Sequence, residues 1–123
     1  MISWKGVHIM SRDLGFWKAN MSLDISNYEI YTLLSSEGYV ANIEELPLEE
    51  ILGDFGTIFN NWKSESELFF EENGESFQLM VSKQFVRVDC YNVKETNMNH
   101  IIDILRKYEC PLYDPIIDVR FDL

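Results

Sequence analysis

The side chains that could carry out chemistry in this sequence are two cysteines, two histidines and many carboxylates. A cysteine nucleophile needs a histidine base within hydrogen-bonding distance. Cys110 and His100 lie on or just past one expected helix, about 15 Å apart at a rise of 1.5 Å per residue, so they are not expected to meet. The sequence contains no nucleophile-elbow, P-loop, dinucleotide-binding or zinc-protease motif. We therefore expect a protein that is not an enzyme.

Metal and cofactor sites are not expected either. His8 and His100 are far in sequence from Cys90 and Cys110, and a metal site would need more ligands. The acidic stretches "DVRFD" and "EELPLEE" lack the spacing of a calcium loop. The glycines of "LGDFGT" would make a poor phosphate cradle, because the acids around them repel phosphate. Both cysteines are expected to be reduced and packed as small apolar side chains.

The carboxylates are distributed unevenly along the chain. Net charge is −11, and residues 37–75 contain eleven acids and a single base, Lys63. The rest of the chain is nearly neutral, with ten acids and nine bases. The stretch "SESELFFEENGES" even surrounds two phenylalanines with glutamates. This composition disfavours binding to nucleic acid or to an anionic membrane surface, and it favours a basic protein as partner.

Helices and antiparallel strands must position these groups. Residues 66–92 are expected to form three strands, because apolar and polar residues alternate and Asn73-Gly74 is a strong hairpin signal. Apolar residues at helical spacing predict a helix over 97–109, starting from a cap at Thr96 or Asn97. The alternating residues 115–123 predict a last strand, near a sheet edge.

The first half predicts further elements of both kinds. Residues 2–11 and 16–25 are interpreted as strands. A helix over 26–38 is indicated by a cap at Ser26, Glu29 three residues on, and a stop at Gly38. Another helix is expected over 47–63, opened by Pro47 and interrupted near Gly53 and Gly56.

The predicted fold is therefore a single α+β domain over residues 1–123, an antiparallel sheet with helices packed on one face. No signal peptide or membrane span is recognised, so a cytoplasmic location is expected.

With these features in view, the chain resembles the small acidic immunity proteins of bacterial toxin–immunity systems, particularly those of contact-dependent growth inhibition. The resemblance rests on a short single domain, a lopsided acidic segment, the lack of a catalytic motif, and the ending "YECPLYDPIIDVRFDL". It implies a protein that binds and neutralises a toxin domain, often a basic nuclease, by covering its active site or substrate surface.

The resemblance also implies roles for individual side chains, in which carboxylates steer the basic partner and aromatic residues anchor it. The anchors are Tyr39, Trp62 and one of Phe69 and Phe70. The steering residues are Glu44, Glu45, Glu49, Glu50, Asp54, Glu65, Glu67, Glu71 and Glu72.

Other interpretations stay open at this point. The acidic segment fits equally well an ordinary solvated face of a small cytosolic interaction or regulatory domain that has no toxin partner. An enzyme of unknown class would require a deep pocket with converging titratable groups. For oligomeric state, a monomer or a weak dimer is expected.

Overall fold

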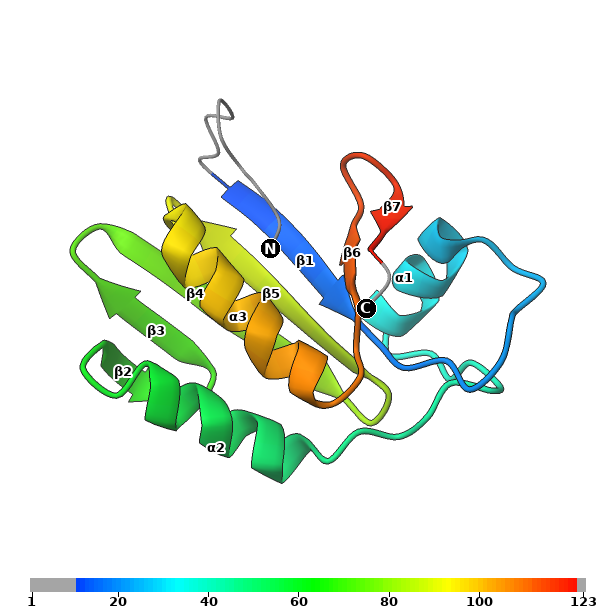
Figure 1. Ribbon diagram of the computed structural model, residues 1–123, viewed down its shortest axis with the longest axis horizontal. Helices are drawn as coiled ribbons and strands as arrows, with labels where there is room; N and C mark the ends of the chain where they lie inside the picture. The colour runs from blue at the N-terminus through cyan, green and yellow to red at the C-terminus, as the bar shows by residue number, and fades with distance from the viewer. Residues whose placement is uncertain (1–10, 122–123) are drawn as a thin grey trace.

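The protein is a seven-stranded antiparallel sheet with three helices, seen here in a computed structural model that describes residues 11–121 (Figure 1). The strand order is β2-β3-β4-β5-β1-β6-β7, so β1 is inserted between β5 and β6. The strands are β1 (Ser11–Phe16), β2 (Lys63–Ser66), β3 (Phe69–Glu72), β4 (Glu75–Ser82), β5 (Phe85–Tyr91), β6 (Leu112–Asp114) and β7 (Val119–Arg120). The helices are α1 (Asn27–Ser35), α2 (Leu48–Ile58) and α3 (Glu95–Lys107). The predicted α+β class with an antiparallel sheet is confirmed.

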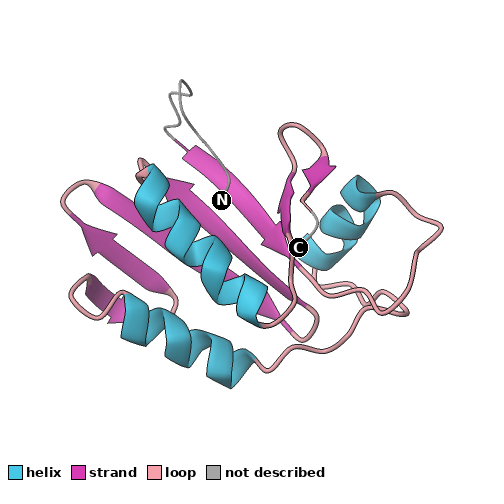
Figure 2. Cartoon of the chain, viewed as in Figure 1, coloured by secondary structure: helices cyan, strands magenta, loops and turns pink. Residues whose placement is uncertain are grey.

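Helices α2 and α3 pack on one face of the sheet, which we call the inner face (Figure 2). Alternate strand residues point to this side, and strand pairing places Leu14 and Leu79 on either side of Val88. Ile51 and Phe55 of α2 are fully buried against them. Burying a side chain of this kind contributes about 1.5–3 kcal/mol, so this face holds most of the stabilising apolar contacts.

Helix α1 packs on the opposite side, the outer face, at the end near β6. Its Tyr31 ring lies 5.9 Å from the Phe85 ring and 5.4 Å from the Tyr113 ring. Gly15 makes room for this contact, because a Cβ atom there would lie 2.9 Å from Cδ1 of Tyr31. The expectation that all helices pack on one face is therefore not confirmed.

The strongest local signals of the sequence form the structures they predict. Asn73 and Gly74 both adopt positive φ, 47° and 85°, and join β3 to β4. Ser26 caps α1, and its Oγ accepts a hydrogen bond from the Glu29 backbone at 3.1 Å. Glu37, with φ of 63°, takes the left-handed position that ends α1, one residue before Gly38.

Helix α3 begins earlier than expected, and its cap comes from a distant strand. The N-cap residue is Lys94, whose own side chain makes no capping bond. Instead, Oε1 of Glu75 accepts hydrogen bonds from the Lys94 backbone at 2.8 Å and from Nδ2 of Asn97 at 2.9 Å. Glu75 is only 6% exposed, so this glutamate of the acidic segment has a structural role.

Several expected boundaries differ from the observed ones. Residues 17–25 form no regular strand, apart from an isolated bridge between Ala19 and Ile43, and most of the strand expected over 2–11 lies outside the described residues. Helix α2 continues through Gly53 and Gly56 without interruption, and β2 is an additional strand. The C-terminal region forms a short hairpin of β6 and β7, which leaves Ile117 and Val119 exposed.

A buried glutamine holds the loop that leads into α2. Gln84, 2% exposed in the β4–β5 turn, accepts a hydrogen bond from the Val40 backbone at 3.0 Å. Its Nε2 donates to the carbonyls of Val40 and Ile43, both at 2.8 Å. The Leu46 backbone also donates to the Lys83 carbonyl at 2.7 Å. These bonds fix the position from which the acidic helix α2 starts.

Candidate functional site

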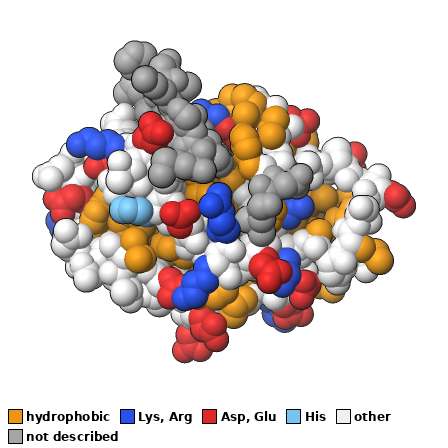
Figure 3. Space-filling model, in the orientation of Figure 1, with side chains coloured by type: hydrophobic (Ala, Val, Ile, Leu, Met, Phe, Trp, Pro, Cys, Tyr) orange, Lys and Arg blue, Asp and Glu red, His pale blue; other side chains and the backbone are white. Residues whose placement is uncertain are grey.

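Helix α2 presents the first group of acidic side chains. Because Ile51 and Phe55 are buried one turn apart, the other side of the helix, with Glu49 and Glu50, faces solvent. Both carboxylates lie in the first turn, where the helix dipole favours negative charge. Figure 3 shows acidic side chains projecting at the lower margin of the molecule, where α2 begins.

The β2–β3 hairpin presents the second group. Helix α2 leads into edge strand β2, and both lie at the same end of the sheet (Figure 1). Every residue of β2 is exposed, as are the turn residue Glu67 and Glu71 of β3. We call the exposed glutamates of α2 and this hairpin the acidic surface, although Glu49 and Glu50 lie at the start of α2, the helix end farther from β2, and Glu71 points to the outer face. Its members are Glu49, Glu50, Glu65, Glu67 and Glu71.

The glutamates of the acidic surface lie outside the ion pairs that the described residues form. None of its five glutamates forms an ion pair with any residue in the described range 11–121. A basic partner would therefore not have to break an ion pair with a described residue, although Lys63 of β2 lies directly opposite Glu71 and offsets part of its charge.

Two other predicted steering residues are already paired. Nζ of Lys18 lies 3.5 Å from a Glu44 oxygen, and Nζ of Lys107 lies 3.0 Å from Oδ2 of Asp54. The Tyr108 hydroxyl donates to the same Asp54 oxygen. These bonds, the tyrosine's first and the lysine's second, lower the pKa of Asp54 below its ordinary value. Both carboxylates therefore contribute less to an external field than the unpaired glutamates do.

The structure separates the two phenylalanines that the sequence left as alternatives. Phe70 is 2% exposed and stacks on Phe77 at 4.9 Å, so it belongs to the core and is not the member of the pair that could anchor a partner. Phe69 is half-buried and lies on the outer face. Of the pair, only Phe69 is placed to touch a partner.

The remaining predicted residues do not all share one surface. Trp62 is half-buried and packs edge-on against Phe59 at 5.0 Å, which makes it mainly a core residue. Tyr39 is 73% exposed, but its loop follows α1, at the end of the molecule away from β2 and β3 (Figure 1). Glu45 is exposed in the loop before α2, and Glu72 is half-buried at the inner side of β3.

The outer face of β3, β4, β5 and β1 carries side chains that the sequence reasoning did not single out as a site. Strand pairing arranges them in two neighbouring rows. One row is Phe69, Gln78, Asp89 and Asp13, and the next is Glu71, Ser76, Tyr91 and Ser11. The alternation along residues 85–91 does indicate this wetter face. It does not indicate that β1 lies beside β5, so Asp13 could not be placed there from the sequence.

Two aspartates meet at one end of the first row. Asp13 and Asp89 lie directly opposite each other on β1 and β5. Arg87 binds Asp89 through two nitrogens, at 2.8 and 3.1 Å. Burial and then the adjacent Asp89 carboxylate raise the pKa of Asp13. Burial, followed by the charge of Asp13, also raises the pKa of the neighbouring Tyr31 to about 12.

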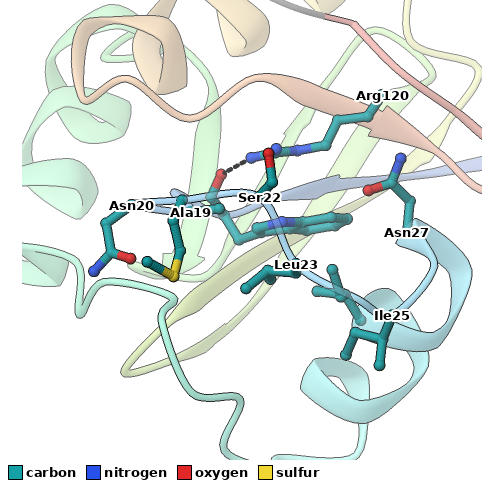
Figure 4. A pocket seen from close by; sticks show the side chains of 10 residues that line it. Ala19, Asn20, Ser22, Leu23, Ile25, Asn27 and Arg120 are labelled. Carbon is teal, nitrogen blue, oxygen red and sulfur yellow. Dashed lines mark hydrogen bonds between the residues drawn. The ribbon is translucent and has the colours of Figure 1, made fainter.

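A hollow of about 460 Å³ lies between the loop after β1 and the start of α1 (Figure 4). Arg120 lies across it, with its guanidinium carbon 4.8 Å from the centre of the Trp17 ring, and donates to the Trp17 carbonyl at 2.7 Å. Nε1 of Trp17 is buried and has no hydrogen-bond partner among the described residues. Loop residues such as Asn20 and Ser22 form the rim.

A second hollow of about 300 Å³ runs between α2 and α3, lined mainly by apolar atoms. Ile58 and Ile104 contribute to it, as do the charged residues Asp54, Asp103 and Lys107. His100 also lines this second hollow, so four titratable side chains border it, whereas Arg120 is the one charged residue in the lining of the first.

The cysteines have the environment of core residues. Cys90 and Cys110 are free and 1% exposed. Burial raises the pKa of the Cys90 thiol well above its ordinary range, and that of Cys110 to about 12. Within residues 11–121, no three His, Cys, Asp or Glu side chains are grouped to hold a metal ion. No helix in the same range combines the length and hydropathy needed to cross a bilayer.

Comparison with known proteins adds no relative: no protein-family model, curated protein or solved structure matches this chain.

Proposed function

We propose that this chain is a cytoplasmic immunity protein that binds and neutralises the basic toxic domain of a bacterial toxin–immunity pair, of the contact-dependent growth inhibition type. The observation that carries the proposal is the acidic surface of α2 and the β2–β3 hairpin, whose exposed glutamates have no ion pair with the described residues. In a chain of net charge −11, this surface suits a cationic macromolecule.

The mechanism is electrostatic steering followed by surface occlusion. A concentrated negative field raises association rates, up to about 10⁸–10⁹ M⁻¹s⁻¹ at low salt. A nuclease binds nucleic-acid phosphates with clustered lysines and arginines. Carboxylates on the inhibitor bind the same lysines and arginines and so exclude the nucleic-acid substrate. The chain needs no catalytic group for this task.

The test begins with affinity capture from the native strain, at low and at high salt. The basic domain of a captured protein is then expressed in a bacterial host, with and without this chain. We expect the domain alone to arrest growth and co-expression to restore it. An acidic partner, or growth arrest that the chain does not relieve, would contradict the proposal. It would favour a regulatory interaction domain with an ordinary acidic surface.

Charge reversal then tests the surface itself. Glu49→Lys combined with Glu50→Lys should slow association with the captured domain by about tenfold or more at low salt, because it removes unpaired steering charge. The difference should shrink at high ionic strength, where the Debye length falls to about 3 Å at 1 M. Stopped-flow fluorescence measures the rate, and the urea midpoint checks that folding is intact.

A matched control reverses two other exposed acids that form no ion pair with described residues, Asp24 and Glu37, which lie around α1. This double variant changes net charge by the same amount. If both double variants slow association equally, then net charge and not the acidic surface governs binding.

A further inference from the structure

The outer face of β3, β4, β5 and β1 is left open by the described part of the chain. Helices α2 and α3 pack on the inner face, and α1 contacts the outer face near Gly15, Phe85 and Tyr113, with Met80 in the same apolar cluster and Tyr31 close to Asp13. In the rows beyond that contact, Asp13, Gln78 and Glu71 are exposed, and Tyr91 is 53% exposed.

The open rows have the composition of a protein-binding surface. Phe69 lies at one end of its row, and Tyr91 lies in the row beside it, so apolar rings stand among small polar side chains. Aromatic side chains are the usual anchors of an interface, and a polar surround excludes water from them. A four-stranded surface of this kind is also rigid, since every strand in it is hydrogen-bonded to its neighbours.

The charges on this face are acidic and incompletely compensated. Asp13, Asp89 and Glu71 are negative. Arg87 is bound to Asp89 through two nitrogens and also attracts Asp13, and Lys63 of β2 lies directly opposite Glu71, so three acids face two bases. Asp13 forms no ion pair with a described base and stands opposite a second carboxylate. Like charges directly opposite each other in a sheet repel, and a cation placed between them removes that repulsion.

We propose that this outer face is the docking platform for the basic partner, and that an arginine or lysine of the partner sits against the Asp13 and Asp89 carboxylates while Tyr91 and Phe69 pack on its apolar side chains. This inference rests on the proposed function and deepens it by naming the contact surface. Glu71 belongs to both the platform and the acidic surface, so charges that steer on the hairpin lead directly onto the platform.

A defined probe tests the platform without the natural partner. Acetylated, amidated tetra-arginine peptide is titrated into ¹⁵N-labelled protein, and amide chemical shifts are followed. We expect the largest shifts at Asp13, Asp89 and Tyr91. Asp13→Asn should weaken the peptide's apparent affinity about three- to tenfold, because one charge-assisted contact is lost. Asp24→Asn removes an equal charge away from the platform and is the matched control.

Tyr91→Ala tests the anchor with the captured toxin domain. Because Tyr91 is exposed, the variant should fold normally while the complex dissociates at least about tenfold faster. Asp13→Asn should affect the same complex, and Asp24→Asn should not.

Each outcome decides between distinct conclusions. Peptide shifts concentrated on α2, or Asp13→Asn behaving like Asp24→Asn, would overturn the platform. Concentration-dependent broadening of the platform amides without peptide would also overturn it, since the face would then be covered by a second copy of the chain. If reversal of Glu49 and Glu50 slows toxin binding while the platform variants do not, the immunity proposal stands and only the platform fails.

Discussion

Replacing Gln84 with leucine should destabilise the protein strongly, although leucine has a similar size and is more apolar. The glutamine makes three hydrogen bonds, one from the Val40 backbone and two to the carbonyls of Val40 and Ile43. Each intramolecular hydrogen bond contributes about 0.5–1.5 kcal/mol net, and a buried polar group left without a partner costs about 1–3 kcal/mol. Val40 and Ile43 are both less than 10% exposed, at 7% and 4%, so water does not readily replace the glutamine.

We therefore expect Gln84→Leu to lower the free energy of unfolding by about 2–4 kcal/mol. With a urea m-value of about 2 kcal/mol per molar, the unfolding midpoint should fall by about 1–2 M. Circular dichroism and tryptophan fluorescence follow the transition. The second probe tests whether unfolding stays two-state, which the conversion to free energy requires.

Gln78→Leu is the matched control. Gln78 is exposed on β4, so this substitution makes the same chemical change without leaving buried backbone groups unpaired. It should alter stability by no more than about 0.5 kcal/mol. If the two variants differ by less than that amount, the argument that Gln84 satisfies buried backbone groups is refuted.

Two further predictions concern carboxylates with opposite roles. Asp13 has a raised pKa in the folded protein, from burial and from Asp89, with Arg87 acting in the opposite sense, so its ionised form opposes folding. Asp13→Asn should therefore stabilise the protein at pH 7 by a few tenths of a kcal/mol, on the scale of about 0.2–1 kcal/mol for a cross-strand pair. The gain should shrink as pH falls towards 3.8, the ordinary pKa of the group. Urea midpoints at both pH values measure it, and an equal gain at both would contradict the linkage. Glu75→Ala removes the cap of α3 and should lower the free energy of unfolding by about 1–3 kcal/mol. Glu71→Ala, at an exposed position of the same β3–β4 hairpin, should leave it nearly unchanged. Comparable losses in these two variants would show that the cap is not stabilising.

Local signals in the sequence predicted local structure well. The Asn73-Gly74 turn and the Ser26 cap act over a few residues, and the structure confirms both. β2 could not be found in this way, because an edge strand that is exposed along its whole length has no apolar alternation to reveal it. Packing of α1 on the outer face depends on the close contact between Gly15 and Tyr31, and no pattern in the sequence indicates that contact.

For the candidate site, too, the sequence predicted local features and missed those that depend on contacts between distant residues. Charge composition identified the acidic segment, but composition does not show which acids are paired or buried. Asp54 and Glu44 are paired with lysines distant in sequence, and Glu75 is buried beneath α3. Strand register, which brings Asp13 beside Asp89, arises only from the folded sheet.

The insertion of β1 between β5 and β6 has a consequence for biosynthesis. A ribosome releases β1 well before either neighbour, and its second neighbour, β6, is made only at residues 112–114. Both edges of β1 carry open backbone groups until β5 is made, and the second edge stays open until β6 follows, so β1 can pair with the wrong chain. Such non-local pairing slows folding. We expect newly made protein to depend on chaperones that shield this strand during translation, and a circular permutant that places β1 after β5 to lose that dependence.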